Sequence, residues 1–500
     1  MSNFKIPKQT EAEKDEYLID CFYDAGFIES LIQSNLSIIS GRKGTGKTAL
    51  ARYLEQECNK YNIDIALRIS FRDISLGLED NKRDHVNSIL FFLIIKTIQK
   101  FLERDVFEGK SKDHWVDFLV QNGLQQISDY ETFFESKREN KNGFSIKGLI
   151  SSIFAKVEGK ISSQDNSTFS RSEISNSPSS LIEALRQSLP KDKTLLIFID
   201  DITDYLDVTD IKLIKEEISV IQDLLLKIEV YNSNFSDSGL KLRFISLVRS
   251  DLFEYMEGSN INKLRNDSLE LKWNEESFAG LLVRRLPFYE NNMEDSLKEP
   301  KEAIRRVFPD AIFSDALRDF DTNRYTTNFY AYMVAISFNR PRDFLMFCYA
   351  MRDRLSSKHE ATFENIESAE IEYSDYFTRE LKDELFLASR VLGFEADQEK
   401  VNLLIDILSK KDGFNSSQLR TDLSQYLGEK TSWGRKKIEA FIEELWWYGI
   451  LGFKEEKNNV IAFKYISGHA PFFMSKIKNY ILYLHRGLWW FSQKRKNRKK

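Results

Sequence analysis

Cysteine and histidine are scarce in this chain, and their scarcity excludes several kinds of site. The three cysteines, Cys21, Cys58 and Cys348, lie far apart in 500 residues and show neither a metal-binding spacing nor the even number of a disulfide framework. The five histidines are scattered and indicate no metal site and no Ser–His–Asp or Cys–His arrangement. Because cysteines that form no disulfide framework suit a reducing compartment, we expect a cytoplasmic protein.

Long apolar runs and a strong net charge are missing as well. The longest apolar run, ILFFLII at Ile89–Ile95, is too short to span a bilayer. The N-terminus is polar and acidic and lacks the apolar core of a signal peptide. A net charge of -5 and a pI near 5.8 argue against a strongly basic nucleic-acid binder, while a local basic surface remains compatible with them.

What the sequence does contain is a glycine-rich loop behind an apolar run. The loop GRKGTGKT at Gly41–Thr48 follows LSII at Leu36–Ile39 and matches G-x-x-x-x-G-K-[ST] in full. A helix-forming segment runs on to Asn62, and IDIALRIS at Ile63–Ser70 predicts a second strand. This order of strand, loop, helix and strand is that of a βαβ unit.

The residue types of the loop suit a nucleotide. Glycines at 41, 44 and 46 can take backbone angles that a side chain forbids, so that successive N–H groups converge on phosphates. Lys47 would reach the β- and γ-phosphates, and the hydroxyl of Thr48 would ligate Mg²⁺. A glycine turn with a surface lysine is the simpler alternative. No guanine-reading segment stands out, so ATP is the expected nucleotide. The predicted ATP-binding residues are Gly41, Arg42, Lys43, Gly44, Thr45, Gly46, Lys47, Thr48 and Ala49.

Two acids follow a second apolar run. TLLIFI, which starts at Thr194, is typical of a central parallel strand and ends at Asp200 and Asp201. We expect Asp200 to hold Mg²⁺ through water and Asp201 to orient the attacking water as a general base. The alternative is an acidic strand end that caps the next helix. Because Asp is one methylene shorter than Glu, slow turnover is predicted.

Three arginines are further candidates for the nucleotide site. Arg249 closes the predicted strand FISLV, and Arg340 and Arg342 stand at the start of a predicted helix, Asn339–Asp353. We expect the strand of Arg249 to lie next to the strand of Asp200, which would place Arg249 to sense the γ-phosphate. One of Arg340 and Arg342 would reach back to the nucleotide from the helical domain and stabilise its charge. An ordinary surface or salt-bridge arginine is the alternative for all three.

Taken in order, five segments resemble bacterial P-loop ATPases of the STAND and AAA+ kind. They are GRKGTGKTAL, LLIFIDD, FISLVRSDLFEYM, LKWNEESFAGLLVRRL and NRPRDF, within about residues 15–350. More narrowly, the chain is similar to a bacterial group whose loop is GRKGTGK, and its double Asp matches STAND proteins better than AAA+ machines. The resemblance implies a parallel sheet with the loop strand and the acidic strand adjacent, a helical lid, a nucleotide-driven switch and a setting in antiviral defence.

The C-terminal part predicts a winged helix. Three predicted helices, starting near residues 401, 416 and 432, precede LGFKEEKNNVIAFKY, two short strands around a polar turn. In a DNA-binding version Arg435, Lys436 and Lys437 would face the bases. The winged helix of STAND-like proteins also serves as an internal clamp, and both readings stay open. The basic tail Lys494–Lys500 has two interpretations. It either binds nucleic acid or another anionic surface by electrostatic attraction, or it is a solvated basic end of the chain.

We thus predict an α/β P-loop NTPase core, a parallel sheet flanked by helices, followed by a helical lid and a C-terminal, mainly α, winged-helix-like domain. Its function is either an ATP- and Mg²⁺-dependent regulatory switch, acting on an unknown protein partner or by self-assembly, or a DNA-dependent ATPase. No membrane span is expected. The predicted parts are an N-terminal helical segment 1–30, the core 31–255 with an insertion at about 75–190, the lid 256–375, the winged-helix-like domain 376–490 and the tail 491–500.

Overall fold

The structure is a computed structural model of the whole chain. It describes residues 5–7, 11–71, 82–121, 178–202, 211–253, 256–286, 292–310, 328–352, 354, 361–391, 414–415, 418–419, 421–422, 425, 442, 445–446, 449–454, 461–462 and 481–488.

The chain divides into two compact units. The sheet unit comprises Gly26–Lys43 and Lys47–Leu271. The helical unit comprises Met1–Ala25, Lys272–Lys500 and the three loop residues Gly44–Gly46.

A parallel five-stranded sheet forms the centre of the sheet unit. Its strand order is β2-β3-β4-β1-β5. Every residue of β3 is buried, as expected for a strand covered on both faces. The strands are β1 (Ile38–Gly41), β2 (Ile65–Ser70), β3 (Leu195–Asp200), β4 (Leu242–Arg249) and β5 (Leu269–Glu270).

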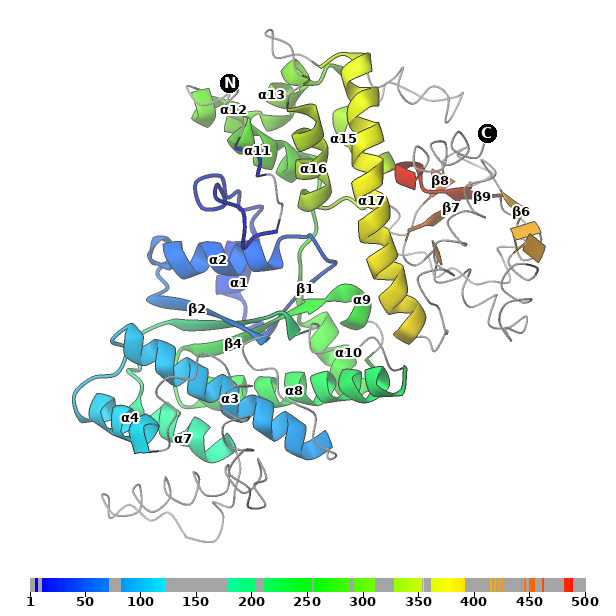
Figure 1. Ribbon diagram of the computed structural model, residues 1–500. Helices are drawn as coiled ribbons and strands as arrows, with labels where there is room; N and C mark the ends of the chain where they lie inside the picture. The colour runs from blue at the N-terminus through cyan, green and yellow to red at the C-terminus, as the bar shows by residue number, and fades with distance from the viewer. Residues whose placement is uncertain are drawn as a thin grey trace. The chain divides into compact units, whose positions relative to one another are not determined.

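Helices cover both faces of this sheet. Figure 1 shows α2 on one face and α3 and α8 on the other. Because parallel neighbours need a crossover, the helices follow the strands in alternation along the chain. The helices of the unit are α1 (Phe27–Gln33), α2 (Lys47–Glu57), the 3₁₀ turn η1 (Cys58–Tyr61), α3 (Lys82–Glu103), α4 (Lys110–Gln121), α7 (Pro178–Ser188), α8 (Ile211–Asp237), α9 (Ser250–Phe253) and α10 (Ser259–Asn266).

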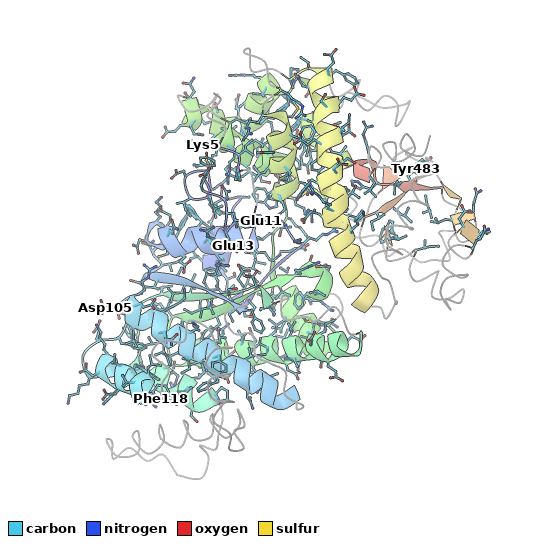
Figure 2. The ribbon with its side chains drawn as sticks, viewed as in Figure 1. Lys5, Glu11, Glu13, Asp105, Phe118 and Tyr483 are labelled. Atoms are coloured by element: carbon cyan, nitrogen blue, oxygen red, sulfur yellow. The ribbon has the colours of Figure 1, made fainter. Side chains whose placement is uncertain are left out.

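An aromatic cluster joins α3 to α4, and on the side of α3 it begins with Phe101, whose ring centroid lies 5.9 Å from that of Phe107. Trp115 packs against Phe107 and Phe118 with ring centroids 5.9 and 5.7 Å apart, and its indole donates to the hydroxyl of Ser188 on α7. Figure 2 labels Phe118 on α4 and Asp105 just after the end of α3. Asp105 forms an ion pair with Lys112 of α4. This corner lies within the region predicted as an insertion.

The lateral strand order corrects one prediction. The acidic strand β3 pairs with β2 and β4, whereas the loop strand β1 pairs with β4 and β5. The loop strand and the acidic strand are therefore not adjacent, because β4 lies between them. The prediction that the strand of Arg249 neighbours the strand of Asp200 is confirmed.

Apolar residues at helical spacing, Leu18, Phe22, Phe27, Leu31 and Ile32, predict a helix over Tyr17–Gln33. This prediction is wrong in its first half, since α1 begins at Phe27. Upstream, the carboxylate of Asp15 accepts a hydrogen bond from the backbone N–H of Tyr17, a local bond that competes with a helix. The same carboxylate forms a buried ion pair with Arg285. Gly26, with φ of 85°, then separates this segment from α1.

The helical unit is built around one aromatic core. Phe278 stacks on Phe344 with ring centroids 3.7 Å apart, and Phe308 stacks on Phe329 at 4.2 Å. Its helices are α11 (Glu275–Arg285), α12 (Met293–Lys298), α13 (Pro300–Val307), α15 (Phe329–Ile336), α16 (Pro341–Met351), α17 (Phe363–Val391) and the 3₁₀ turn η5 (Arg486–Leu488). The predicted helix at Asn339–Asp353 is thus present as α16.

A second, antiparallel sheet belongs to the helical unit, with strand order β6-β9-β7-β8. Its strands are β6 (Phe414–Asn415), β7 (Leu451–Lys454), β8 (Ile461–Ala462) and β9 (Ile481–Leu484). The predicted pair of short strands is confirmed by β7 and β8. Most residues of the three helices predicted before it lie outside the described part of the chain. Among the described residues, no helix is long and apolar enough to cross a bilayer.

Candidate nucleotide site

The glycine loop links β1 directly to α2. The Nζ of Lys47 donates to the backbone carbonyls of Gly41 and Arg42 at 2.6 and 3.1 Å, so the lysine side chain folds back over the start of its own loop. Because α2 begins at Lys47, the N–H groups of its first turn have no partner within the helix and carry the positive end of the helix dipole. The local arrangement is that of an anion-binding loop.

Two of the three glycines adopt the backbone that the sequence predicts. Gly44 and Gly46 have φ of 87° and 100°, a region that side chains disfavour. Gly41 is instead the last residue of β1 and has no positive φ, so its expected special backbone is not observed. At Gly41 the chain is still an ordinary strand, paired in register with Arg249 of β4.

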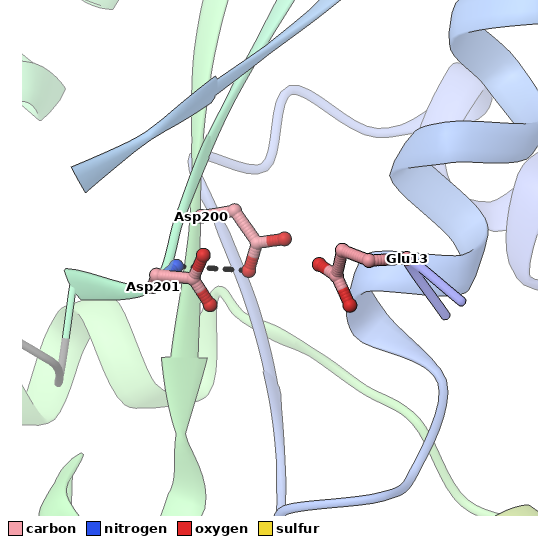
Figure 3. Close-up of side chains that lie close together, drawn as sticks. All are labelled: Glu13, Asp200 and Asp201. Carbon is pink, nitrogen blue, oxygen red and sulfur yellow. Dashed lines mark hydrogen bonds between the residues drawn. The ribbon is translucent and has the colours of Figure 1, made fainter. Parts of the chain in front are cut away.

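The acid pair lies at the carboxyl end of β3. The backbone N–H of Asp201 donates to Oδ1 of Asp200 at 2.9 Å (Figure 3). The side chain of Thr48, in the first turn of α2, hydrogen-bonds the carboxylate of Asp200. Asp201 itself has φ of 59°, an uncommon backbone that Asp tolerates better than most residues. The structure therefore brings together Thr48 and Asp200, which the sequence separates widely.

Strand β2 supplies two partners for these acids. Arg68 Nη1 lies 3.0 Å from Oδ2 of Asp200 and 3.9 Å from Oδ2 of Asp201. The hydroxyl of Ser70 donates to Oδ2 of Asp201 at 2.9 Å. Arg68 and Ser70 are two residues apart and so point to the same face of the sheet, toward the acids of the neighbouring strand.

The electrostatics of Asp200 combine opposing effects. Burial raises the pKa of Asp200 above its ordinary value, and the nearby charge of Asp201 raises it further. The charge and hydrogen bond of Arg68, and the hydrogen bond from Thr48, oppose that rise. The carboxylate side chain is only 5% exposed, so the arginine is its principal charge compensation in this unit.

Arg249 ends β4 beside the loop strand. Its guanidinium makes two hydrogen bonds to the carboxylate of Asp251. Because it is the register partner of Gly41, its backbone lies at the edge of the sheet where the loop begins. The arginine that the sequence singles out is thus near the loop strand and held by a neighbouring acid.

The two arginines of α16 differ from each other. Arg340 is fully buried and forms a bidentate ion pair with Asp343, with Nε–Oδ2 and Nη2–Oδ1 distances of 2.9 and 3.0 Å. Arg342 forms an ion pair with Glu380 at 3.3 Å, and its backbone N–H lies 3.4 Å from the carbonyl of Gly44. A Cβ at Gly44 would meet the Cβ of Arg342 at 3.1 Å, which explains the need for glycine there beyond its φ.

The loop residues of the helical unit have one more partner. The indole Nε1 of Trp273 donates to the carbonyl of Thr45 at 2.9 Å. Trp273 packs on Phe278 of α11 with ring centroids 5.3 Å apart, and its own carbonyl accepts from Asn339 Nδ2 at 3.3 Å. The backbone of Gly44–Gly46 is therefore hydrogen-bonded both to Trp273, which packs on the aromatic core of this unit, and to Arg342 at the start of α16.

Sequence reasoning missed Arg68, Ser70 and Trp273. A charged residue inside the otherwise apolar strand IALRIS was the signal for Arg68, since such a side chain needs a buried partner. Trp273 gave no comparable signal. The predicted DNA contacts Arg435, Lys436 and Lys437 lie outside the described residues.

The donor set suits Mg²⁺ with a nucleotide. Thr48 and Asp200 offer a hydroxyl and a carboxylate, the hard oxygen ligands that Mg²⁺ prefers in phosphate sites. The loop, with Lys47 at its end, offers positive charge and backbone donors for the phosphates. The residues present therefore fit the group that the loop motif implies.

Comparison with known proteins adds one local match. Residues 299–382, within the helical unit, match the FunZ-associated C-terminal helical domain. A search of curated proteins finds no match to this chain.

Three solved structures align along most of the chain at low similarity. The Orc1 protein of Aeropyrum pernix in complex with DNA is 13% identical over 96% of this chain and 94% of that one, with a TM-score of 0.37. Cdc6p from Pyrobaculum aerophilum is 11% identical over 99% and 96%, with a TM-score of 0.29. Drosophila ORC bound to DNA is 12% identical over 93% and 90%, with a TM-score of 0.23. Scores this low do not establish a shared fold. The assignment of an α/β fold with a parallel sheet flanked by helices therefore rests on the strand order and on the glycine loop between β1 and α2.

Proposed function

We propose that this chain is an ATP-binding, slowly hydrolysing P-loop ATPase that acts as a nucleotide-dependent regulatory switch. The observation that carries the proposal is the hydrogen bond between Thr48 and Asp200. This bond joins the first turn of α2, directly after the glycine loop, to the end of the acidic strand β3. It does so although β4 lies between β3 and the loop strand β1. A glycine turn with a surface lysine gives no reason for this pairing.

Each residue has a role that follows from its chemistry. Lys47 and the N–H groups of Gly44, Gly46 and the first turn of α2 would bind the phosphates. Thr48 and Asp200 would hold Mg²⁺, which when bound neutralises phosphate charge. Asp201 would accept a proton from the attacking water, and its bond to Ser70 fixes the carboxylate for that task.

The helical unit supports the regulatory part of the proposal. Gly44–Gly46 are bound by Trp273 and by the start of α16, so a change in the loop backbone is passed to an aromatic core. Arg249 and one of Arg340 and Arg342 are proposed as residues that respond to phosphate charge. Of the last two, Arg342 is the better candidate, because Arg340 is fully buried in its pair with Asp343. Slow turnover follows from Asp201, which is shorter than the Glu expected in faster enzymes.

The test is ATP binding and steady-state ATP turnover by the purified chain, with Lys47→Ala as the blank. Lys60→Ala is the matched control, because it removes an exposed lysine, paired with Glu57, that has no part in the glycine loop. We expect Mg²⁺-dependent binding and slow turnover in the wild type and in Lys60→Ala, and neither in Lys47→Ala. Binding that survives in Lys47→Ala would contradict the proposal.

Repeating the turnover measurement with double-stranded DNA tests the second function, a DNA-dependent ATPase. The observation in its favour is the antiparallel pair β7–β8, where a wing is predicted. A rate that DNA raises several-fold above the blank would put this function first. A slow rate indifferent to DNA supports the switch acting on a protein partner or on a second copy of the chain.

A further inference from the structure

Arg68 lies where a bound cation would compete for Asp200. Of the two carboxylate oxygens, Oδ1 accepts from the backbone N–H of Asp201, a bond fixed by the chain itself. Oδ2 accepts from Nη1 of Arg68 at 3.0 Å. Of these two bonds, the one that a side-chain movement can break is the bond to Oδ2, and the group that donates it is already positively charged.

The position of Arg68 gives this charge a purpose. The side chains of Asp200 and Asp201 are 5% and 21% exposed, and two adjacent carboxylates repel each other when both are ionised. An arginine cannot lose its proton, and its planar head reaches both acids, at 3.0 and 3.9 Å. It therefore keeps the acid pair compensated when no metal is bound.

We infer that Arg68 is the built-in counter-ion of this acid pair, and that its guanidinium must release Oδ2 of Asp200 before a divalent cation can bind there. The inference rests on the proposed function, in which Asp200 serves a metal. It makes Arg68 a positioning residue that weakens metal binding to the nucleotide-free chain. Neither the glycine-loop motif nor the acidic strand end assigns any role to β2.

The consequence is a site that discriminates between bare cations and cations delivered with a nucleotide. A cation alone must overcome the repulsion of Arg68 at close range. A cation bound to phosphates brings its own anionic charge, which compensates the displaced guanidinium. The chain would then remain metal-free until a nucleotide arrives.

The experiment measures binding of Mn²⁺, without nucleotide, by the loss of the electron paramagnetic resonance signal of the free ion. Arg68→Gln keeps a polar side chain and removes the charge, and it should bind Mn²⁺ about tenfold more tightly than the wild type. Arg186→Gln is the matched control, because it makes the same substitution in an ion pair with Glu183 on α7. Adding Asp200→Asn to Arg68→Gln should remove the gain, which assigns it to this carboxylate.

The outcomes separate the inference from the proposed function. Equal Mn²⁺ affinities, within about twofold, in Arg68→Gln and the wild type would overturn the role of Arg68. Failure of the wild type to bind a fluorescent ATP analogue with Mg²⁺ would overturn the proposed function, whatever the Mn²⁺ result. If Arg68→Gln does not fold, as circular dichroism will show, Arg68→Met, which retains the apolar stem, takes its place.

Discussion

Thr48 and Asp200 are hydrogen-bonded to each other across an edge of the sheet, one from the first turn of α2 and one from the end of β3. The bond pre-positions two oxygen ligands before any metal is present. This hydrogen bond lowers the pKa of Asp200. A substitution of Thr48 that removes its hydroxyl should therefore also raise the pKa of the Asp200 carboxyl group. The pair is therefore the most direct place to test the proposed site.

Thr48→Ala should weaken binding of Mg²⁺–ATP by about tenfold, because a metal ligand and the partner of Asp200 are both removed. Thr48→Ser keeps the hydroxyl and should bind like the wild type. Titration with a fluorescent ATP analogue at fixed Mg²⁺ measures both. Equal affinities for the Ala and Ser variants would contradict the assignment of Thr48 as a ligand.

Asp201→Asn should lower the rate of ATP hydrolysis by at least about a hundredfold while nucleotide binding is retained, because the amide cannot accept the proton of the attacking water. Asn is the suitable substitution, since it tolerates the left-handed backbone at this position. The measurement compares single-turnover hydrolysis with the dissociation constant of the nucleotide. A turnover rate equal to that of the wild type would exclude Asp201 as the base.

Trp273 should report on the loop. Its indole N–H binds the carbonyl of Thr45, so nucleotide binding that shifts this carbonyl should change the emission of the indole. We expect the change in tryptophan fluorescence on adding Mg²⁺–ATP to be smaller in Trp273→Phe. Trp115→Phe, in the aromatic cluster between α3 and α4, is the control and should leave the change intact. The same signal in Trp273→Phe and the wild type would count against a coupling through this bond.

The buried ion pair of Arg340 and Asp343 should dominate the stability of its region. Both side chains are 0% exposed, so Asp343→Ala leaves a guanidinium buried without its charge partner. We expect a loss of about 3–5 kcal/mol in the free energy of unfolding, measured by urea titration. Glu302→Gln, in the exposed pair with Arg305, is the contrast and should cost less than about 1 kcal/mol. Similar losses in the two variants would show that the burial of the pair has no energetic consequence.

Much of the fold could be predicted from local sequence patterns. Strands β1 to β4, the glycine loop and the acidic strand end follow from apolar runs, from the positions of Gly44 and Gly46, and from Asp200. The short strand β5 lies in a region whose sequence predicts mainly helix. The lateral order of the strands could not be predicted in this way. An apolar run indicates that a strand is buried, but it does not indicate whether that strand pairs with β3 or with β4. The failed helix before Phe27 has the same cause: the ion pair of Asp15 with Arg285 is a long-range contact that overrides local propensity.

The candidate site shows the same division. Lys47 and Thr48 belong to the glycine-loop motif, and Asp200 ends an apolar strand. These patterns indicate a phosphate and metal site, so the sequence is sufficient to make the three residues candidates. Arg68 and Ser70 belong to the site only because β2 pairs with β3 in one particular register. A shift of one residue in that register would turn both side chains to the opposite face.

Cys348 should be almost inert to alkylation in the folded protein. It is completely buried on α16, and burial raises the pKa of its thiol to about 12. Because the pKa in the folded chain lies above the ordinary value of 9.0, the folded chain keeps this proton to a higher pH than the unfolded chain does. The free energy of unfolding should therefore be unaffected by this thiol below pH 9 and fall as the pH rises from 9 toward 12. A rise of about three units leaves roughly a thousandfold less thiolate at pH 8, which is the form that reacts. Mass spectrometry after iodoacetamide treatment should find Cys348 unmodified in native protein and modified in urea. Rapid modification of Cys348 in the native chain would show that the packing of α16 opens readily, and would also undermine α16 as a rigid support for Arg340 and Arg342.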